Sequence, residues 1–376
     1  MNRIAALLLG LLIVVGAGWI WLQERDYEWS IDPDMPLPDV PLDNPMSDVK
    51  VELGRWLFHD TRLSVNGTMS CATCHIQALA FTDGKPRSIG ATGVTHPRSS
   101  MTLVNTAYAS RLTWANQLLD QLEDQALTPM FGDNPIEMGM SGKEDAIVEL
   151  LRTDERYAAL LPDAFPGDED PYSVLNVIRS IVTFVRTIIS HDSPYDQYLG
   201  GDERAIGDDA IRGMELFFSE RLECFHCHGG FNFTDSTTHA NSNVDRVGFH
   251  NTGLYNIDGN GAYPADNTGI FDMTGQRHDT GRFKAPTLRN IAVTAPYMHD
   301  GSIATLNEVI AHYARGGRLL EEGPNAGDGR RSPFKSEFIR GFEISDGERT
   351  DLIAFLHSLT DQSVLQNPKF SDPFYD

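Results

Sequence analysis

Apolar residues recur at helical spacing in several stretches of the chain, whereas the alternating pattern of strands is weak throughout. Residues 49–58, 174–189 and 206–218 each collect apolar side chains on one side of a helix. In residues 174–189 this stripe consists of valine and isoleucine and is broad, which predicts a buried helix.

Two more helices are predicted from capping boxes, in which a serine and a glutamate satisfy each other's free backbone donors. Ser141-Gly-Lys-Glu144 precedes a helix over residues 146–151, and Ser345-Asp-Gly-Glu348 precedes one that ends near Leu359. Stretches rich in Gly, Asn and Asp, such as residues 229–284, are typical of ordered loops or partial disorder. The pattern therefore predicts a mostly α-helical fold.

All four cysteines lie in two C-x-x-C-H pentapeptides, the signature of covalent c-type haem attachment. The two thiols add across the haem vinyl groups, and the adjacent imidazole reaches the iron. The alternatives are a thioredoxin-like redox pair and a four-cysteine zinc site, neither of which needs a histidine after each pair. The predicted attachment residues are Cys71, Cys74 and His75 in the first motif and Cys224, Cys227 and His228 in the second.

The arrangement of helix, cysteine motif, loops and closing helix occurs twice along the chain. This repeat predicts two cytochrome-c-like haem domains with long ordered loops, over residues 48–200 and 201–376. Residues 26–47 are rich in proline and aspartate, which predicts an extended acidic linker ahead of the first domain.

The N-terminal residues 1–25 have the composition of a signal peptide or a membrane anchor. Arg3 precedes an apolar run over residues 4–22 that is long enough to span a bilayer, and Trp19 and Trp21 suit a membrane interface. A buried core helix is the alternative. Export to the periplasm is expected, either as a free protein or anchored to the inner membrane by residues 4–22.

The formal net charge of −23 limits the kinds of macromolecule that the protein can bind. Such an acidic surface repels phosphate backbones, which excludes nucleic acid as a partner, whereas a basic protein is compatible with it. Membrane contact is expected only through the N-terminal segment.

Two covalent haems suit either an electron carrier or an enzyme, and the sixth ligand of each iron decides between them. A carrier fills both positions. An enzyme leaves one position open for peroxide or oxygen.

Several longer motifs resemble bacterial di-haem cytochrome c peroxidases over roughly residues 48–360. The motifs are Leu57-Phe-His-Asp-Thr-Arg-Leu-Ser64, Asn134-Pro-Ile-Glu-Met138, Phe283-Lys-Ala-Pro-Thr-Leu-Arg-Asn290 and Thr294-Ala-Pro-Tyr-Met-His-Asp-Gly301. Within that superfamily, Leu112-Thr-Trp-Ala-Asn116 and the loop from Thr92 to Arg98 are most similar to the MauG/MbnH branch, whose members oxidise protein side chains.

The resemblance assigns a distal ligand to the second haem. In the family a methionine stands sixteen residues after the tyrosine of the P-Y-x-H-D-G motif, and here that position is Tyr313. A tyrosine there marks the MauG-like branch, and a phenolate favours higher iron oxidation states than a thioether does. Packing of Tyr313 on its helix is the alternative, and Met298 is the rival ligand if the protein is a carrier.

The resemblance makes the His75 haem the open, peroxide-binding one. Glu137 matches the distal glutamate that moves a proton between the peroxide oxygens, and Pro129 matches a proline that limits access. His96 lies in the loop that holds a distal histidine in some peroxidases. It has three interpretations: a ligand that closes the site, an acid–base group, or a surface residue.

Trp114 matches the tryptophan that lies between the two haems of the family and relays electrons, with a core tryptophan as the alternative. Its flanking sequence is Trp-Ala-Asn-Gln instead of the family's Trp-Asp-Gly-Arg, a departure that fits the MauG/MbnH branch. The family also binds one calcium ion, here through the carbonyls of Thr294 and Pro296. Ser99 stands at the position of an asparagine ligand, with Asn105 further on.

The resulting prediction is a di-haem oxidoreductase that uses hydrogen peroxide to form a high-valent di-haem state. That state oxidises a Trp or Tyr residue on a partner protein. The first alternative is a cytochrome c peroxidase that reduces peroxide with electrons from a small cytochrome c. The second is a non-catalytic di-haem electron carrier.

Overall fold

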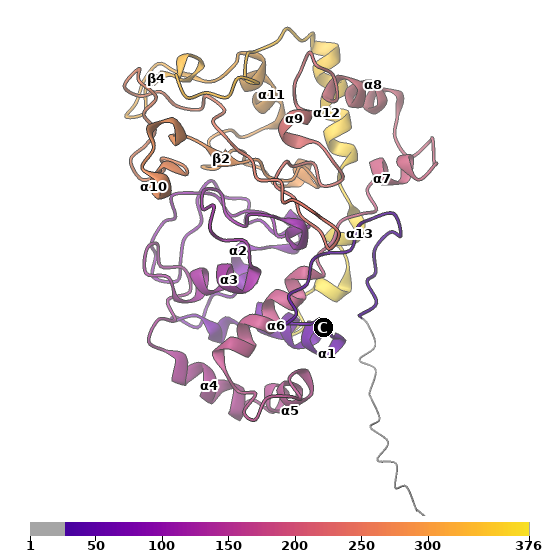
Figure 1. The fold of residues 1–376 in the computed structure, drawn as a ribbon, viewed down its shortest axis with the longest axis vertical. Coiled ribbons are helices and arrows are strands. Elements are labelled where there is room, and N and C mark those ends of the chain that lie inside the picture. Colours follow the sequence, from indigo (N-terminus) through magenta and orange to yellow (C-terminus); the bar gives the residue numbers. More distant parts are fainter. Residues whose placement is uncertain (1–26, 376) are drawn as a thin grey trace, which may run out of the picture.

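Helices and loops dominate the computed structural model, which describes residues 27–375 (Figure 1). The first half contains α1 (Asp48–His59), α2 (Cys71–Cys74), α3 (Leu122–Phe131), α4 (Glu144–Thr153), α5 (Glu155–Ala164) and α6 (Val174–Arg186). The second half contains α7 (Pro194–Leu199), α8 (Asp208–Phe217), α9 (Phe225–His228), α10 (Phe271–Thr274), α11 (Leu306–Ala314), α12 (Asp346–Ser358) and α13 (Gln362–Leu365). The mostly α fold is therefore confirmed.

Strands are confined to two antiparallel pairs of two residues each within the described chain. One pair joins β1 (Phe249–His250) to β2 (Phe283–Lys284), and the other joins β3 (Leu319–Leu320) to β4 (Gly327–Asp328). The 3₁₀ turns are Thr61–Leu63, Gln77–Leu79, Thr106–Tyr108, Arg277–Asp279, Ile291–Val293, Gly329–Arg331 and Pro368–Phe370.

One of the two predicted capping boxes forms. Ser345 Oγ accepts a hydrogen bond from the Glu348 amide at 3.3 Å, and Glu348 Oε2 accepts from the Ser345 amide at 2.9 Å. The box predicted at Ser141 is wrong, because α4 begins at Glu144 with Lys143 as its N-cap. There the Glu144 carboxylate accepts from the Gly142 amide, in a turn that Gly142 makes with positive φ.

A similar crossing of two helices forms the core of each of two modules, one in each half of the chain. In the first module α1 packs on α6, and in the second α8 packs on α12. Each crossing has a glycine at its closest point. A Cβ atom on Gly54 would lie 1.9 Å from the Ser180 carbonyl oxygen, and one on Gly213 would lie 1.9 Å from that of Asp351.

The C-terminal segment returns from the second module to the first. Val364, Leu365 and Phe370 belong to the hydrophobic core of the first module. The Gln77 side chain donates hydrogen bonds of 2.9 Å to the carbonyls of Val364 and Asn367. The end of the predicted second domain, residues 201–376, thus packs on the first module.

The proline-rich segment that was predicted as a linker is extended but lies against the body of the protein. Asn44 is fully buried, and its side-chain amide donates to Glu123 at 2.7 Å. Further along, the carbonyls of Pro36 and Leu37 accept hydrogen bonds from the Tyr108 hydroxyl and the Ala240 amide. These contacts tie the segment to both halves of the chain.

The predicted signal peptide or anchor falls outside the described residues. Between residues 27 and 375, none of the helices has the length and apolar character that a membrane span requires.

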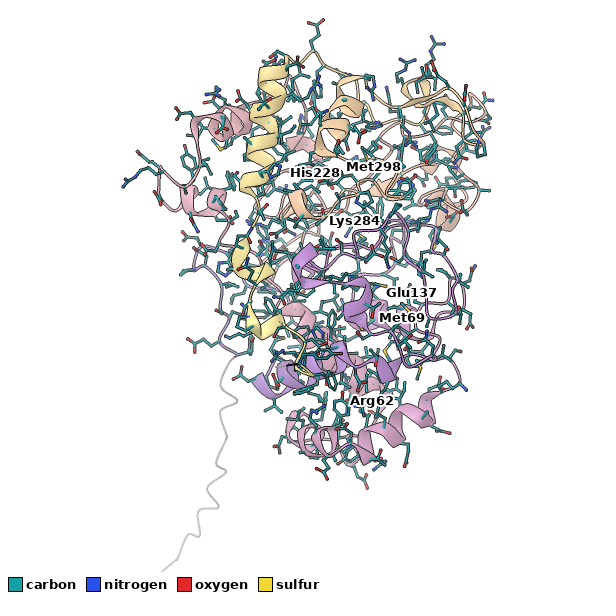
Figure 2. The ribbon with its side chains drawn as sticks, turned by 180° about the vertical axis from the view of Figure 1, so that it is seen from behind. Arg62, Met69, Glu137, His228, Lys284 and Met298 are labelled. Carbon is teal, nitrogen blue, oxygen red and sulfur yellow. The ribbon has the colours of Figure 1, made fainter. Side chains whose placement is uncertain are left out.

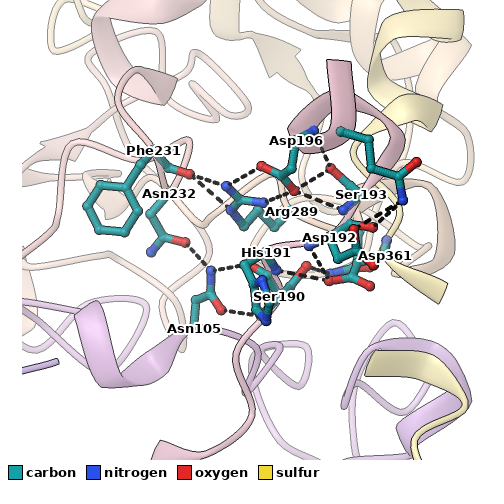
Figure 3. A network of polar contacts seen from close by, with 12 residues as sticks. Asn105, Ser190, His191, Asp192, Ser193, Asp196, Phe231, Asn232, Arg289 and Asp361 are labelled. Carbon is teal, nitrogen blue, oxygen red and sulfur yellow. Dashed lines mark hydrogen bonds and ion pairs between the residues drawn. The ribbon is translucent and has the colours of Figure 1, made fainter. Parts of the chain in front are cut away.

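A buried polar network fixes the segment that joins the two modules (Figure 3). Asn105 donates to Asn232 Oδ1 at 3.0 Å and accepts from the Ser190 amide at 2.7 Å. Arg289 binds both carboxylate oxygens of Asp196, at 2.8 and 3.0 Å. Two-point bonds of this kind fix orientation as well as distance.

We expect Gly213→Ala to destabilise the folded protein by about 1–3 kcal/mol, because the new methyl group meets the backbone of α12. Gly347→Ala is the matched control, since it lies in α12 with open space around its Cβ position. It should leave stability unchanged or raise it by about 0.5 kcal/mol. Denaturant unfolding of the two holoproteins measures the difference, and equal midpoints would contradict the close crossing.

Candidate functional site

The first C-x-x-C-H motif opens onto a cavity of about 250 Å³ in the first module. The α2 helix supplies the cysteines, and the predicted distal residues come from α3 and from the loops before and after it. Cys71, Cys74, His75, His96, Trp114, Pro129 and Glu137 all line this one cavity.

The His75 imidazole is held by a backbone carbonyl. Its Nδ1 lies 2.8 Å from the Phe81 oxygen, and Phe81 adopts the left-handed φ of 60° that turns this oxygen inward. A carbonyl can only accept, so Nδ1 carries the proton and Nε2 keeps its lone pair. Burial lowers the pKa of His75, which keeps the ring neutral. A neutral, oriented imidazole of this kind suits an iron ligand.

The second module holds its histidine in the same way, beside a cavity of about 180 Å³. His228 Nδ1 lies 3.2 Å from the carbonyl oxygen of Phe233, whose φ of 49° is also left-handed. Burial again lowers the pKa of the imidazole. Both sets of residues therefore fit a haem attached through its vinyl groups and held by one histidine.

The two cysteine pairs lie in different cavities. None of the metal-ligand groupings among residues 27–375 combines them, which rules out a shared four-cysteine zinc site.

Glu137 and His96 meet in the first cavity, where His96 Nδ1 lies 3.8 Å from Glu137 Oε1. Burial raises the pKa of Glu137 to about 7 and lowers that of His96. The amide of Ala91 donates to the Glu137 carbonyl at 2.7 Å and fixes that residue's backbone. His96 lines the cavity and has 14% of its side chain exposed, which favours its interpretations as a ligand or an acid–base group.

Tyr313 and Met298 both line the second cavity, so the structure brings the two candidate distal ligands to one place. Tyr313 comes from α11, and burial raises the pKa of its phenol. Its hydroxyl makes no hydrogen bond with any described residue. Met298 comes from a loop with a left-handed φ of 70°. Figure 2 labels Met298 and His228 in the second module and Glu137 in the first.

Trp114 lines both cavities. Its indole N–H donates to the Ser99 carbonyl at 2.9 Å, and its own carbonyl accepts from the Lys284 amide at 2.8 Å. Trp114 is thus held between the modules, with its ring bonded to Ser99 and its backbone bonded to Lys284.

The residues predicted to hold calcium bond to protein groups. Ser99 Oγ donates to the Met298 carbonyl at 3.2 Å, and Thr294 Oγ1 donates to that of Ile291 at 3.2 Å. The Asn105 amide is fully engaged in the network described above. The ligands predicted at Thr294 and Pro296 are backbone carbonyls, which these side-chain bonds do not test, so the calcium site stays a prediction.

Several residues of the second cavity were missed as site residues. His250 falls in the stretch 229–284 that was predicted as loop, yet its Nε2 lies 2.5 Å from Asp235 Oδ2 at the cavity wall. Lys284 is buried and donates to the Arg111 carbonyl at 2.8 Å, and burial lowers its pKa to about 8. The pairing of β1 with β2 places His250 beside this strand, a contact too distant in sequence for spacing to reveal.

Comparison with known proteins agrees with this arrangement. Residues 48–204 match the family model for di-haem cytochrome c peroxidase. The chain is 36% identical to the methylamine utilization protein MauG of Methylorubrum extorquens, over 85% of this chain and 80% of that protein. The chain belongs to the di-haem cytochrome c peroxidase family. It is therefore an oxidoreductase with two c-type haems.

Relatives named as cytochrome c peroxidases and relatives named as MauG-like proteins are both similar to this chain. Cytochrome-c peroxidase IdrP1 of a Pseudomonas species is 34% identical over 87% of this chain and 86% of its own length. A solved MauG-like protein associated with microbial copper homeostasis is 49% identical, with a TM-score of 0.91. That match covers 93% of this chain and 99% of the other. The di-haem peroxidase BthA of Burkholderia thailandensis, at 20% identity and a TM-score of 0.64, shares the fold.

Proposed function

We propose that the protein uses hydrogen peroxide to oxidise a tryptophan or tyrosine side chain on a partner protein, as a MauG-like enzyme. The observation that carries this proposal is the unequal pair of cavities. One places a carboxyl group and an imidazole together, and the other offers a phenol with no hydrogen-bond partner in the described chain. The 36% and 49% identities to MauG and to a MauG-like protein support it.

When bound, the two haems would supply the redox chemistry, since together they could accept both oxidising equivalents of one peroxide molecule. His75 and His228 would hold them, and Tyr313 would be a further ligand of the second. The Glu137 carboxylate takes a proton from one peroxide oxygen and returns it to the other, which leaves as water. Pro129 narrows the same cavity, and His96 adjoins the proton-moving group.

Trp114 has the position of an electron relay, because its ring reaches both cavities. Exchange through Trp114 lets a substrate react at the protein surface without entering the peroxide cavity. The substrate is then a docked protein rather than a small molecule. Export to the periplasm, proposed from residues 1–25, is consistent with c-type haem attachment outside the cytoplasm.

A cytochrome c peroxidase that draws electrons from a small cytochrome c is the second candidate. Met298 lines the second cavity together with Tyr313, so a thioether ligand is available there. Relatives named as cytochrome c peroxidases also match, including cytochrome c551 peroxidase of Pseudomonas aeruginosa at 28% identity. The ligand of the second haem distinguishes the two functions.

We expect the rate of reaction with peroxide to rise with pH through about 7, because the deprotonated form of Glu137 takes the first proton. His96 stays neutral in this range, since burial lowers its pKa. Glu137→Gln should lower the rate constant about 100-fold or more and flatten this pH dependence. Stopped-flow absorption measures both quantities.

Asp133→Asn is the control for Glu137→Gln, because Asp133 lies exposed in the same loop and lines neither cavity. It should react as the wild type does. An unchanged rate and pH profile in Glu137→Gln would contradict the proton-moving role.

Tyr313→Met tests the proposed function itself. After one equivalent of peroxide, the wild type should store two oxidising equivalents long enough to titrate them with a reductant. The variant should lose this store, because a thioether stabilises lower iron oxidation states than a phenolate does. Turnover with a reduced cytochrome c should persist or increase. A variant that stores oxidising equivalents as long as the wild type would favour the plain peroxidase.

A further inference from the structure

The loop that follows His96 is held by a side chain of the other module. Arg98 Nε donates to Asn267 Oδ1 at 2.8 Å, and Asn267 Nδ2 donates to the Pro97 carbonyl at 3.1 Å. Asn267 is 1% exposed, so water has little access to compete for either hydrogen bond. One amide thus binds two consecutive residues across the boundary between the modules.

Further residues of the second module, including two that line its cavity, also hold this loop. The Arg98 guanidinium lies 5.5 Å from the centre of the Phe283 ring and 3.4 Å from Asp272. The Ser99 amide donates to the His299 carbonyl at 2.8 Å. Phe283 and His299 line the second cavity, and their rings stack on each other at 3.6 Å. Residues 97–99 are therefore fixed by the module that does not contain Glu137.

On its other side the loop is attached to the backbone of Glu137. The His96 amide donates to the Ser88 carbonyl at 2.9 Å, and that of Ala91 donates to the Glu137 carbonyl at 2.7 Å. The Glu137 carboxyl group lies 3.8 Å from Nδ1 of the His96 ring. The position of the His96 ring thus depends on two attachment points, one in each module.

We propose that Asn267 and Arg98 form an inter-module clamp that positions His96 beside Glu137 in the first cavity. Both are positioning residues, because they act through His96. The inference rests on the proposed function only in taking this cavity as the one that meets peroxide. A released loop frees an imidazole next to a haem site, and imidazole is a strong ligand for iron.

The test is Asn267→Ala in the full-length holoprotein, read by the spin state of the resting ferric haems. The wild type should show one high-spin haem. Loss of two hydrogen bonds should shift the loop equilibrium about tenfold towards states in which His96 binds iron. The high-spin signal should fall, and the rate of reaction with peroxide should fall with it. Arg98→Lys should shift both in the same direction, since lysine cannot reproduce the planar contacts of arginine.

Two further variants decide the mechanism. The double variant His96→Ala with Asn267→Ala should regain the high-spin signal, because the competing imidazole is gone. Asn260→Ala is the matched control. This exposed asparagine of the second module donates from its side-chain amide to the Asp258 carbonyl at 3.2 Å. It should leave the spin state unchanged.

An unchanged spin state in both Asn267→Ala and Arg98→Lys would overturn the clamp, and so would a loss of high-spin signal that His96→Ala does not reverse. Failure of the proposed function looks different. In that case the wild type does not store the oxidising equivalents of peroxide, while the spin-state changes in the variants still report on the clamp.

Discussion

Both cavities depend on a buried histidine imidazole whose Nδ1–H donates a hydrogen bond to a backbone carbonyl. The carbonyls belong to Phe81 and Phe233, which both adopt left-handed backbone conformations a few residues after their cysteine motifs. This bond fixes the tautomer and aims the free nitrogen lone pair into the cavity. The two modules thus repeat one way of holding a haem, so any difference in chemistry must come from the other walls.

Those other walls differ in kind. The first cavity joins a carboxyl group of raised pKa to a neighbouring imidazole, a pair that can move protons. The second places a phenol and a thioether near its histidine and is otherwise largely apolar. Trp114 is the side chain that reaches both, and Ser99 and Lys284 hold it from opposite modules. A shared scaffold with unequal cavities suits an enzyme that reacts at one haem and stores charge at the other.

Local patterns in the sequence carried much of this account. The C-x-x-C-H motifs placed six site residues in two cavities, and the broad apolar stripe of residues 174–189 appears as the buried helix α6. What depended on distant contacts was missed. The C-terminal segment joins the first core because of apolar packing that no spacing reveals. The loop position of His250 concealed its pairing with Asp235, and the serine at 141 was displaced as a cap by a glycine turn.

Unequal coordination of the two irons is the central claim, and electron paramagnetic resonance of the resting ferric protein tests it most directly. The account predicts one high-spin signal from the haem on His75 and one low-spin signal from the haem on His228. Two low-spin signals that persist when peroxide is added would contradict it.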